Sequence, residues 1–188
     1  LVLKFGGTSM GDVERIQRAA RIVAGARQGG QALCVVVSAM AGETDRLVRL
    51  AREAGGEMAG GPAVFGPGFD DEYDVIVAAG EQVATGLLAL ALRQLGLPAR
   101  SWQNWQIPIR TDGDHARARI QAIESAQLGA AMDGGEVAII PGFQGITADG
   151  RITTLGRGGS DTSAVAMAAA LRAQRCDIHT DVDGVYTT

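Results

Sequence analysis

Residues 1–9 read LVLKFGGTS, a short apolar run followed by a lysine, a pair of glycines and two hydroxyl residues. The run Leu1–Phe5 is typical of a buried strand, and Asp12–Ala26 repeats apolar residues at the spacing of one helix face. A strand that turns through Gly-Gly into a helix predicts a parallel α/β fold, because parallel strands need a crossover between them. Lys4 is also the only lysine of the chain, since 16 of its 17 basic residues are Arg.

The remaining sequence continues the alternation of strands and helices. This order predicts one α/β domain whose mainly parallel sheet is covered on both faces. Ligands of such folds bind at the carboxyl ends of the strands, which directs attention to the loops that follow them. We expect strands over Ala32–Val37, Pro98–Trp102, Glu136–Ile140 and Cys176–Thr180, helices over Thr44–Ala54, Asp71–Leu95, Asp114–Met132 and Asp161–Gln174, a surface loop over Gly55–Phe69, and a β-excursion over Gly142–Thr154 that turns at Asp149-Gly150.

Composition excludes several classes of function. With 46% hydrophobic and 20% charged residues the chain is globular, and a net charge of −4 argues against nucleic acid as a partner. No apolar run approaches the roughly 20 residues that span a bilayer, so no membrane association is expected. Cys34 and Cys176 are interpreted as reduced core residues of a cytoplasmic protein, and with only His115 and His179 beside them no metal site is expected.

Two glycine-rich loops have the character of anion sites. Gly6 and Gly7 follow Lys4, and the segment TLGRGGSDTSA at 154–164 places three glycines before a predicted helix. Backbone N–H groups at such helix starts favour anions, and Arg157 offers a two-point contact for a carboxylate. The second loop matches neither the P-loop nor the GxGxxG pattern. The alternatives are a tight turn whose lysine extends to solvent and an ordinary capped helix start.

Three further segments are candidate ligand contacts. The loop Ser38–Thr44 has small residues and hydroxyls that suit a small-substrate pocket, or else Thr44 simply caps a helix. Gly80 in mid-helix suggests close approach of another group, and the adjacent Glu81 either pairs with an ammonium group or is a solvated surface residue. The segment Thr180–Thr187, with two aspartates and a tyrosine, suits ribose or metal-phosphate contacts, or else is a plain Asp-Gly turn.

Taken in order, KFGGTS, SAMAG, AAGEQ, PGFQG, TTLGRGGSDTSA and TDVDGVYTT resemble the aspartate kinases of the amino acid kinase family, from Leu1 to Thr188. The resemblance implies a three-layer α/β/α sandwich around a mainly parallel sheet. It also implies phosphorylation of the β-carboxylate of L-aspartate by ATP with Mg²⁺, which is the first step of lysine, threonine and methionine biosynthesis, in a homo-oligomer. The chain is then a catalytic domain truncated at both ends, without the regulatory ACT domains.

The resemblance also implies roles for single residues. Lys4 would contact the transferred phosphoryl group and Asp161 would organise that lysine. Glu81 would hold the ammonium group of aspartate and Arg157 its α-carboxylate. Ser38 and Thr44 would contact the substrate, and the phosphates and nucleotide would be bound by Gly6, Gly7, Ser9, Gly158, Gly159, Ser160, Thr180, Asp181 and Tyr186.

The chemistry that this assignment requires is electrostatic. A β-carboxylate has an ordinary pKa of about 3.9, so it is ionised at neutral pH and needs no general base. The site must instead supply positive charge and in-line positioning for two anions. Glu43 departs from the family pattern by adding a negative charge beside the substrate loop. Two other functions remain open: an amino acid kinase for a different carboxylate, and a non-catalytic module that binds nucleotide or amino acid.

Overall fold

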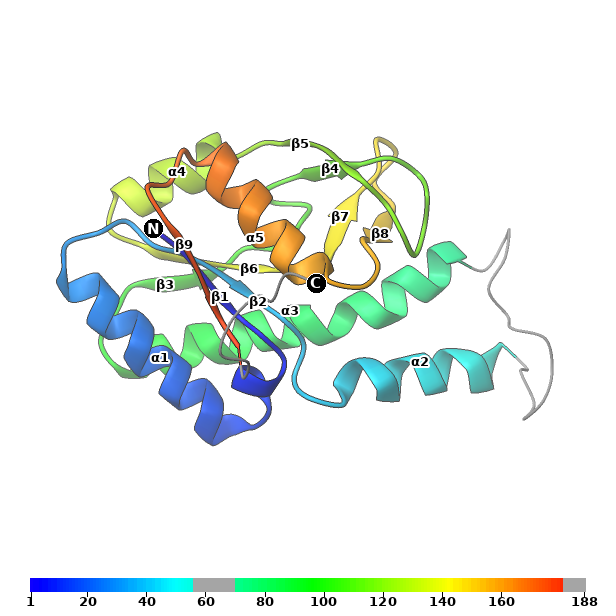
Figure 1. Cartoon of the computed structure of the whole chain (residues 1–188), viewed down its shortest axis with the longest axis horizontal. Coiled ribbons are helices and arrows are strands. Elements are labelled where there is room, and N and C mark those ends of the chain that lie inside the picture. The colour runs from blue at the N-terminus through cyan, green and yellow to red at the C-terminus, as the bar shows by residue number, and fades with distance from the viewer. Residues whose placement is uncertain (56–69, 181–188) are drawn as a thin grey trace, which may run out of the picture.

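Five parallel strands form the central sheet of the protein, in the order β3-β6-β2-β1-β9 (Figure 1). The structure is a computed structural model that describes residues 1–55 and 70–180, so the predicted loop Gly55–Phe69 falls almost entirely outside the described residues. Each predicted strand of the sheet is present. The strands are β1 (Val2–Phe5), β2 (Cys34–Val37), β3 (Ala99–Ser101), β6 (Val137–Pro141) and β9 (Cys176–His179).

Helices cover both faces of this sheet, which confirms the three-layer α/β/α prediction (Figure 1). Alternate strand residues point to opposite faces, so Leu3 and Phe5 pack toward one helix pair while Val2 and Val36 pack toward the other. The first pair is α1 (Val13–Gln28) with α3 (Asp70–Gln94), the second is α4 (Ala126–Asp133) with α5 (Gly159–Ala170), and α2 (Glu43–Ala54) lies against α3.

One predicted helix is wrong. The segment Asp114–Met132 contains strand β5 (Ile120–Ile123) and becomes helical only at α4. Its start alternates buried Ala118 with exposed Arg119, and Asp112 accepts hydrogen bonds from the N–H groups of Asp114 and Arg119, which closes a loop instead of a helical turn. The strand joins a second, four-stranded sheet in the order β5-β4-β7-β8, with β4 (Ile109–Thr111), β7 (Gln144–Ile146) and β8 (Ile152–Thr154).

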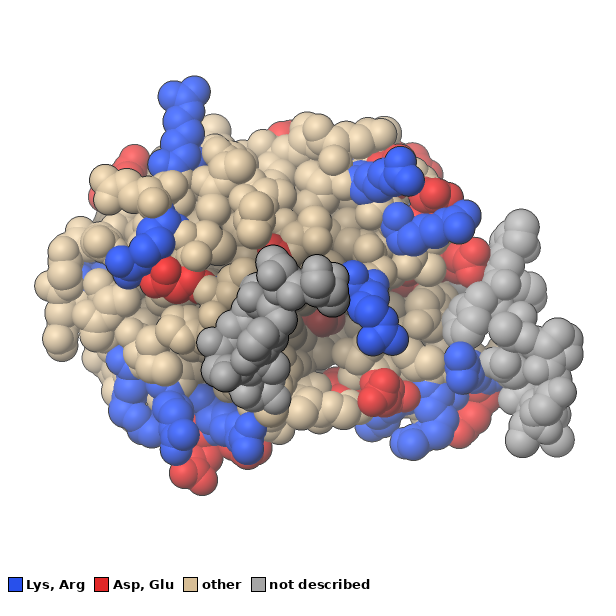
Figure 2. Space-filling model, in the orientation of Figure 1, with Lys and Arg blue, Asp and Glu red and all other residues tan. Residues whose placement is uncertain are grey.

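The β7–β8 pair confirms the predicted β-excursion, because its two strands are antiparallel and Gly150 takes a left-handed conformation in the turn between them. The core prediction is confirmed for Cys34, which is buried, and Trp102 is buried as well. Cys176 is only half-buried, and Trp105 is 56% exposed. On the face shown in Figure 2, basic side chains gather along α1 with acidic side chains at their lower edge, while basic and acidic side chains alternate over α2.

Helix α3, with 25 residues, is the longest helix of the described chain and contains a long apolar stretch. By length and composition alone it is sufficient to cross a bilayer, which corrects the prediction that no segment reaches that length. In the structure it packs between α1, α2 and the sheet, with Val77, Ala84 and Leu88 fully buried. Its apolar character is therefore explained by its place in the core.

Gly80 is the point at which α3 meets the loop after β2. A Cβ atom at this position would lie 2.8 Å from the Cβ of Ala39, a distance that side chains do not tolerate. The predicted close approach at Gly80 is therefore confirmed, and the approaching group is the loop itself. Gly86, six residues further along the same helix, has no atom within 4 Å of a Cβ placed there.

These two glycines form a matched pair for a stability test. We expect Gly80→Ala to lower the free energy of unfolding by about 1–3 kcal/mol through overpacking against the loop. Gly86→Ala should raise it by up to about 1 kcal/mol, because alanine is the better helix former. Urea denaturation measures both. Equal stabilisation of the two variants would contradict the packing described for Gly80.

Candidate active site

The carboxyl ends of the parallel strands and the start of α5 enclose one cavity of about 330 Å³. The loops that follow β1, β2 and β6 line it, together with one turn of α3 and the loop before α5. Ten of the residues that the sequence predicts as site residues meet here: Lys4, Gly7, Ser38, Thr44, Glu81, Arg157, Gly158, Gly159, Ser160 and Asp161.

Lys4 reaches this cavity because of its phase in strand β1. It alternates with Leu3 and Phe5 and so shares the sheet face of Val2, toward α5. Its side chain is buried, and its Nζ lies 2.6 Å from Oδ1 of Asp161 in the first turn of α5. A Cβ at Gly6 would lie 3.4 Å from the ammonium, so the glycine leaves room for it. The Lys4 ammonium is thus held at the wall of the cavity by an ion pair with Asp161, which lines the same cavity.

The loop before α5 has a path that requires glycine. Gly156 and Gly158 both have a φ of +76°, in the left-handed region. A Cβ at Gly159 would lie 2.9 Å from Leu155 Cβ and 2.9 Å from Phe143 Cδ2. The tight loop therefore brings the N-terminus of a 12-residue helix to the wall of the cavity. The partial positive charge of that helix end favours an anion there.

Glu81 is buried at the floor of the cavity, with 3% of its surface exposed, so its interpretation as a solvated surface residue is wrong. Its Oε1 accepts a hydrogen bond from the N–H of Ala39 at 3.1 Å. Within residues 1–55 and 70–180, Oε2 has no hydrogen-bond partner. Burial raises the pKa of this carboxyl to about 7. A buried acceptor without a partner suits a cationic ligand group.

The other rim of the cavity carries Arg157, which is exposed and stands across from the loop of Ser38 and Thr44. Helix α2 begins after Gly42 with its φ of +77°, so Thr44 lies inside the first turn and is not the predicted cap. Glu43 forms an ion pair with Arg46 at 2.6 Å, and this hydrogen-bonded guanidinium holds the pKa of Glu43 below its ordinary value. The extra charge beside the loop is thus balanced within α2.

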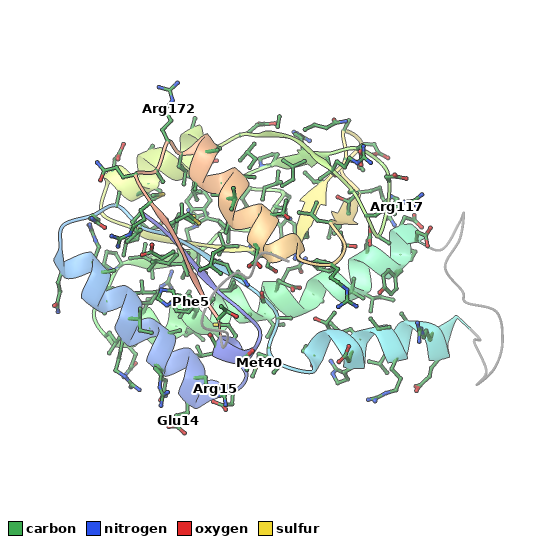
Figure 3. The ribbon with its side chains drawn as sticks, viewed as in Figure 1. Phe5, Glu14, Arg15, Met40, Arg117 and Arg172 are labelled. Atoms are coloured by element: carbon green, nitrogen blue, oxygen red, sulfur yellow. The ribbon has the colours of Figure 1, made fainter. Side chains whose placement is uncertain are left out.

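Two predicted nucleotide contacts lie elsewhere. Ser9 and Thr180 line a second cavity of about 580 Å³, on the α1 side of β1 and β9. Phe5 and Arg15, both labelled in Figure 3, are part of its wall, and the Phe5 ring stacks on His179 with centroids 4.7 Å apart. Gly6 is among the lining residues of neither cavity, and a Cβ on it would lie 3.4 Å from Lys4 Nζ and 3.6 Å from the His179 carbonyl oxygen. Asp181 and Tyr186 lie outside the described residues.

Comparison with known proteins identifies the family to which this architecture belongs. The model of the amino acid kinase family matches residues 1–188. The chain belongs to the amino acid kinase family. It is 50% identical over 188 residues to the aspartate kinase of Pseudomonas fluorescens SBW25, of which it covers 44%, and 48% identical to aspartokinase 2 of Bacillus subtilis 168, of which it also covers 44%. The chain thus spans less than half the length of these curated relatives.

Solved structures agree with the fold of this family member. Aspartokinase III of E. coli, in complex with aspartate and ADP, matches with a TM-score of 0.81 and 31% identity over 99% of this chain and 50% of that one. Aspartate kinase from Synechocystis matches with a TM-score of 0.74 and 44% identity over 96% of this chain and 28% of that one. Giardia carbamate kinase, at 14% identity, shares the fold, with a TM-score of 0.71 over 97% of this chain and 74% of that one.

Phe143 is a cavity residue of this amino acid kinase that sequence reasoning missed. It lines the same cavity as Lys4 and Glu81, and its φ of +68° is unusual for a residue other than glycine. Its N–H donates to Ser163 Oγ at 3.1 Å and its carbonyl accepts from the Leu155 N–H at 2.8 Å. The motif PGFQG marked the segment, but a left-handed phenylalanine leaves no signal in a single sequence.

The raised pKa of Glu81 predicts a pH-dependent stability. Its folded pKa, about 7, lies above the ordinary value of 4.5 expected for the unfolded chain. Folding is therefore favoured with this group protonated, and the contribution present below pH 4.5 is lost as pH rises through 7, to the order of 3 kcal/mol. Glu81→Gln keeps the acceptor for Ala39 and removes the titration. We expect it to gain stability over the wild type at pH 8 but not at pH 4, as measured by urea denaturation.

Glu43→Gln is the matched control for this prediction. Its carboxyl has a pKa shifted in the opposite direction by Arg46, so removing its charge should give no gain at pH 8. A gain for Glu81→Gln that is the same at both pH values would contradict burial as the cause of its raised pKa.

Proposed function

We propose that the chain is the catalytic domain of an aspartate kinase, which transfers the γ-phosphoryl group of ATP to the β-carboxylate of L-aspartate and yields 4-phospho-L-aspartate. The observation that carries the proposal is one cavity that joins a buried, half-satisfied Glu81, an exposed Arg157 and the Lys4–Asp161 ion pair. The curated relatives that match all 188 residues are named aspartate kinase or aspartokinase, and the structure of E. coli aspartokinase III in complex with aspartate and ADP matches 99% of the chain.

The amino acid would be held by its head group. Glu81 Oε2, which has no hydrogen-bond partner in the described chain, would accept the α-ammonium group, and ionised Glu81 is the form that attracts it. The Arg157 guanidinium would hold the α-carboxylate by two parallel hydrogen bonds. Ser38 and Thr44 line the same cavity and would orient the side-chain carboxylate. A substrate without a free ammonium or α-carboxylate would leave one of these charges buried or unused.

Phosphoryl transfer would then depend on positive charge. The attacking carboxylate is already ionised, so the obstacle is its repulsion from the triphosphate. Lys4, held by Asp161, would contact the transferred group, while Gly6, Gly7 and the α5 start at Gly158, Gly159 and Ser160 would approach the phosphates with their backbones. The Lys4 ammonium and these backbone N–H groups are held in position before the reaction. Charges and dipoles fixed in this way stabilise a transition state without having to reorganise.

The proposed reaction also requires a bound nucleotide and a metal ion. Bound ATP supplies the phosphoryl group, and Mg²⁺ would neutralise its phosphates, as this ion is usually held partly by substrate oxygens. In residues 1–55 and 70–180 no group of three His, Cys, Asp or Glu residues could hold a metal alone. Ser9, Thr180, Asp181 and Tyr186 remain predicted nucleotide contacts. The setting we propose is the cytoplasm, where the free thiols of Cys34 and Cys176 stay reduced, within a homo-oligomer that acts in lysine, threonine and methionine biosynthesis.

Formation of an acyl phosphate tests the proposed function. The full-length protein, incubated with ATP, Mg²⁺ and L-aspartate, should give a hydroxamate when trapped with hydroxylamine. N-acetyl-aspartate should give at least about tenfold less, because it presents no ammonium to Glu81. Equal activity on the acetylated compound would favour a kinase for another carboxylate. Binding of ATP and aspartate by calorimetry without any hydroxamate would favour a non-catalytic module.

The sole lysine gives a sharper test of mechanism. We expect Lys4→Arg to lose most of the turnover, by about a hundredfold or more, because a planar guanidinium does not replace a compact ammonium beside Asp161. ATP binding, followed by calorimetry, should change little. Arg21→Lys, on the outer side of α1, is the matched control for the same exchange in reverse. Turnover near the wild-type level in Lys4→Arg would contradict the role given to Lys4.

A further inference from the structure

We propose that Asp74, outside the cavity, is a positioning residue that sets the place of the Arg157 loop relative to Glu81 and so determines recognition of the amino acid head group. The inference rests on the proposed function. Asp74 lies in the second turn of α3 and is completely buried, and it is neither a cavity residue nor a residue singled out by the sequence.

The carboxylate of Asp74 gathers donors from two separate segments. From the end of β8, Thr154 donates its N–H to Oδ2 at 2.9 Å and its hydroxyl to Oδ1 at 2.5 Å. From the loop between β4 and β5, Ala116 donates its N–H at 3.0 Å and His115 donates from Nδ1 at 2.8 Å, both to Oδ2. Both carboxylate oxygens are therefore fully used, by four donors that lie about 40 or 80 residues away in sequence.

Burial of the Asp74 carboxylate costs free energy, so a functional role would explain why a carboxylate occupies this position. A carboxylate removed from water loses its hydration, and well-packed apolar residues commonly replace such groups without loss of stability. In the part of the chain that the structure describes, no lysine or arginine pairs with Asp74. What Asp74 provides instead is a geometrical tie, because its four donors are directional and meet at one point.

The tie leads directly to Arg157. Thr154, held by Asp74, precedes Leu155, whose N–H is bonded to the Phe143 carbonyl at 2.8 Å. Gly156 then passes so close to Ala116 that a Cβ on it would lie 3.2 Å from the Ala116 carbonyl oxygen. Ala116 itself has a left-handed φ of +63°, a strained conformation that its hydrogen bond to Asp74 helps to maintain. Three successive residues before Arg157 are thus held in place.

Helix α3 positions both groups that would contact the amino acid head group, because it contains Glu81 and, through Asp74, holds the loop that bears Arg157. Asp74 and Glu81 are seven residues apart, which is about two helical turns, or about 10 Å, on the same face. Asp74 holds the loop that bears Arg157, while Glu81 holds the loop of Ala39. The rigid helix between them therefore sets the spacing between the group that would receive the carboxylate and the group that would receive the ammonium. Arg117, which follows the held turn, lies near the start of α3 in Figure 3.

The test separates Thr154, which Asp74 holds, from Thr153, which it does not. Thr153 is equally buried in β8, and its hydroxyl pairs with Thr111 at 2.6 Å instead. Both Thr→Val variants remove one buried hydroxyl from the same strand. We expect Thr154→Val and Asp74→Asn to raise the KM for aspartate about tenfold or more, with the KM for ATP within about twofold. Thr153→Val should leave both KM values unchanged, and Thr154→Ser should restore the wild-type KM.

Hydrogen exchange provides a second measurement that needs no substrate. In Asp74→Asn the amides of 154–159 and 115–118 should exchange faster than in the wild type, while those of 34–39 stay unchanged. A lowered kcat with both KM values unchanged, together with exchange that is unaltered or is raised equally in 34–39, 115–118 and 154–159, would overturn the proposal, because it would show no specific effect of Asp74 on the loop. Failure of the wild-type protein to form hydroxamate would instead count against the proposed function, and exchange would still decide whether Asp74 positions the loop.

Discussion

The ion pair between Lys4 and Asp161 is the contact on which the arrangement of the site depends. A buried ammonium needs a counter-charge within hydrogen-bond distance, and here the two groups come from strand β1 and from the first turn of α5. The pair therefore requires that β1 keep its phase in the sheet and that α5 begin where it does. A shift of one residue in β1 would turn the lysine to the opposite face and place Leu3 or Phe5 against the aspartate.

The loops around this pair derive their shape from what packs behind them. Gly80 lets α3 approach Ala39, and the same turn of α3 supplies Glu81 to that loop. Gly159 lets α5 start against Phe143 and Leu155. The site is thus built where backbones approach each other more closely than side chains would allow. The glycines of this region provide close approach and left-handed turns, and the polar side chains between them face a cavity whose walls have little freedom to move.

Much of this organisation could be predicted from single residues and their spacing. The strand beginning at residue 2, the turn through Gly6-Gly7 and the excursion around Gly150 follow from local patterns that tertiary packing leaves unchanged. Three features could not be predicted from the sequence: the strand in place of a helix near Ile120, the burial of Glu81 and the contacts of Asp74. Arg117–Ile120 alternates with a period of two, yet its alanines and arginines also suit a helix, and pairing with β4 decided the outcome. Glu81 has the sequence context of an ordinary helical glutamate, and its burial comes from a loop 42 residues away. Asp74 is hidden for the same reason, because its donors are scattered along the chain.

The chain carries arginine at 16 of its 17 Lys and Arg positions, and this composition has a chemical consequence. Acyl phosphates, the class of product proposed for this site, transfer their acyl group to amines. The only lysine of the chain is Lys4, which is buried and held in an ion pair. An acyl phosphate that leaves the cavity therefore meets guanidinium groups, which are far weaker nucleophiles, over the outside of this chain. The side chains on the outside of this chain would therefore offer no lysine amine for such a product to acylate.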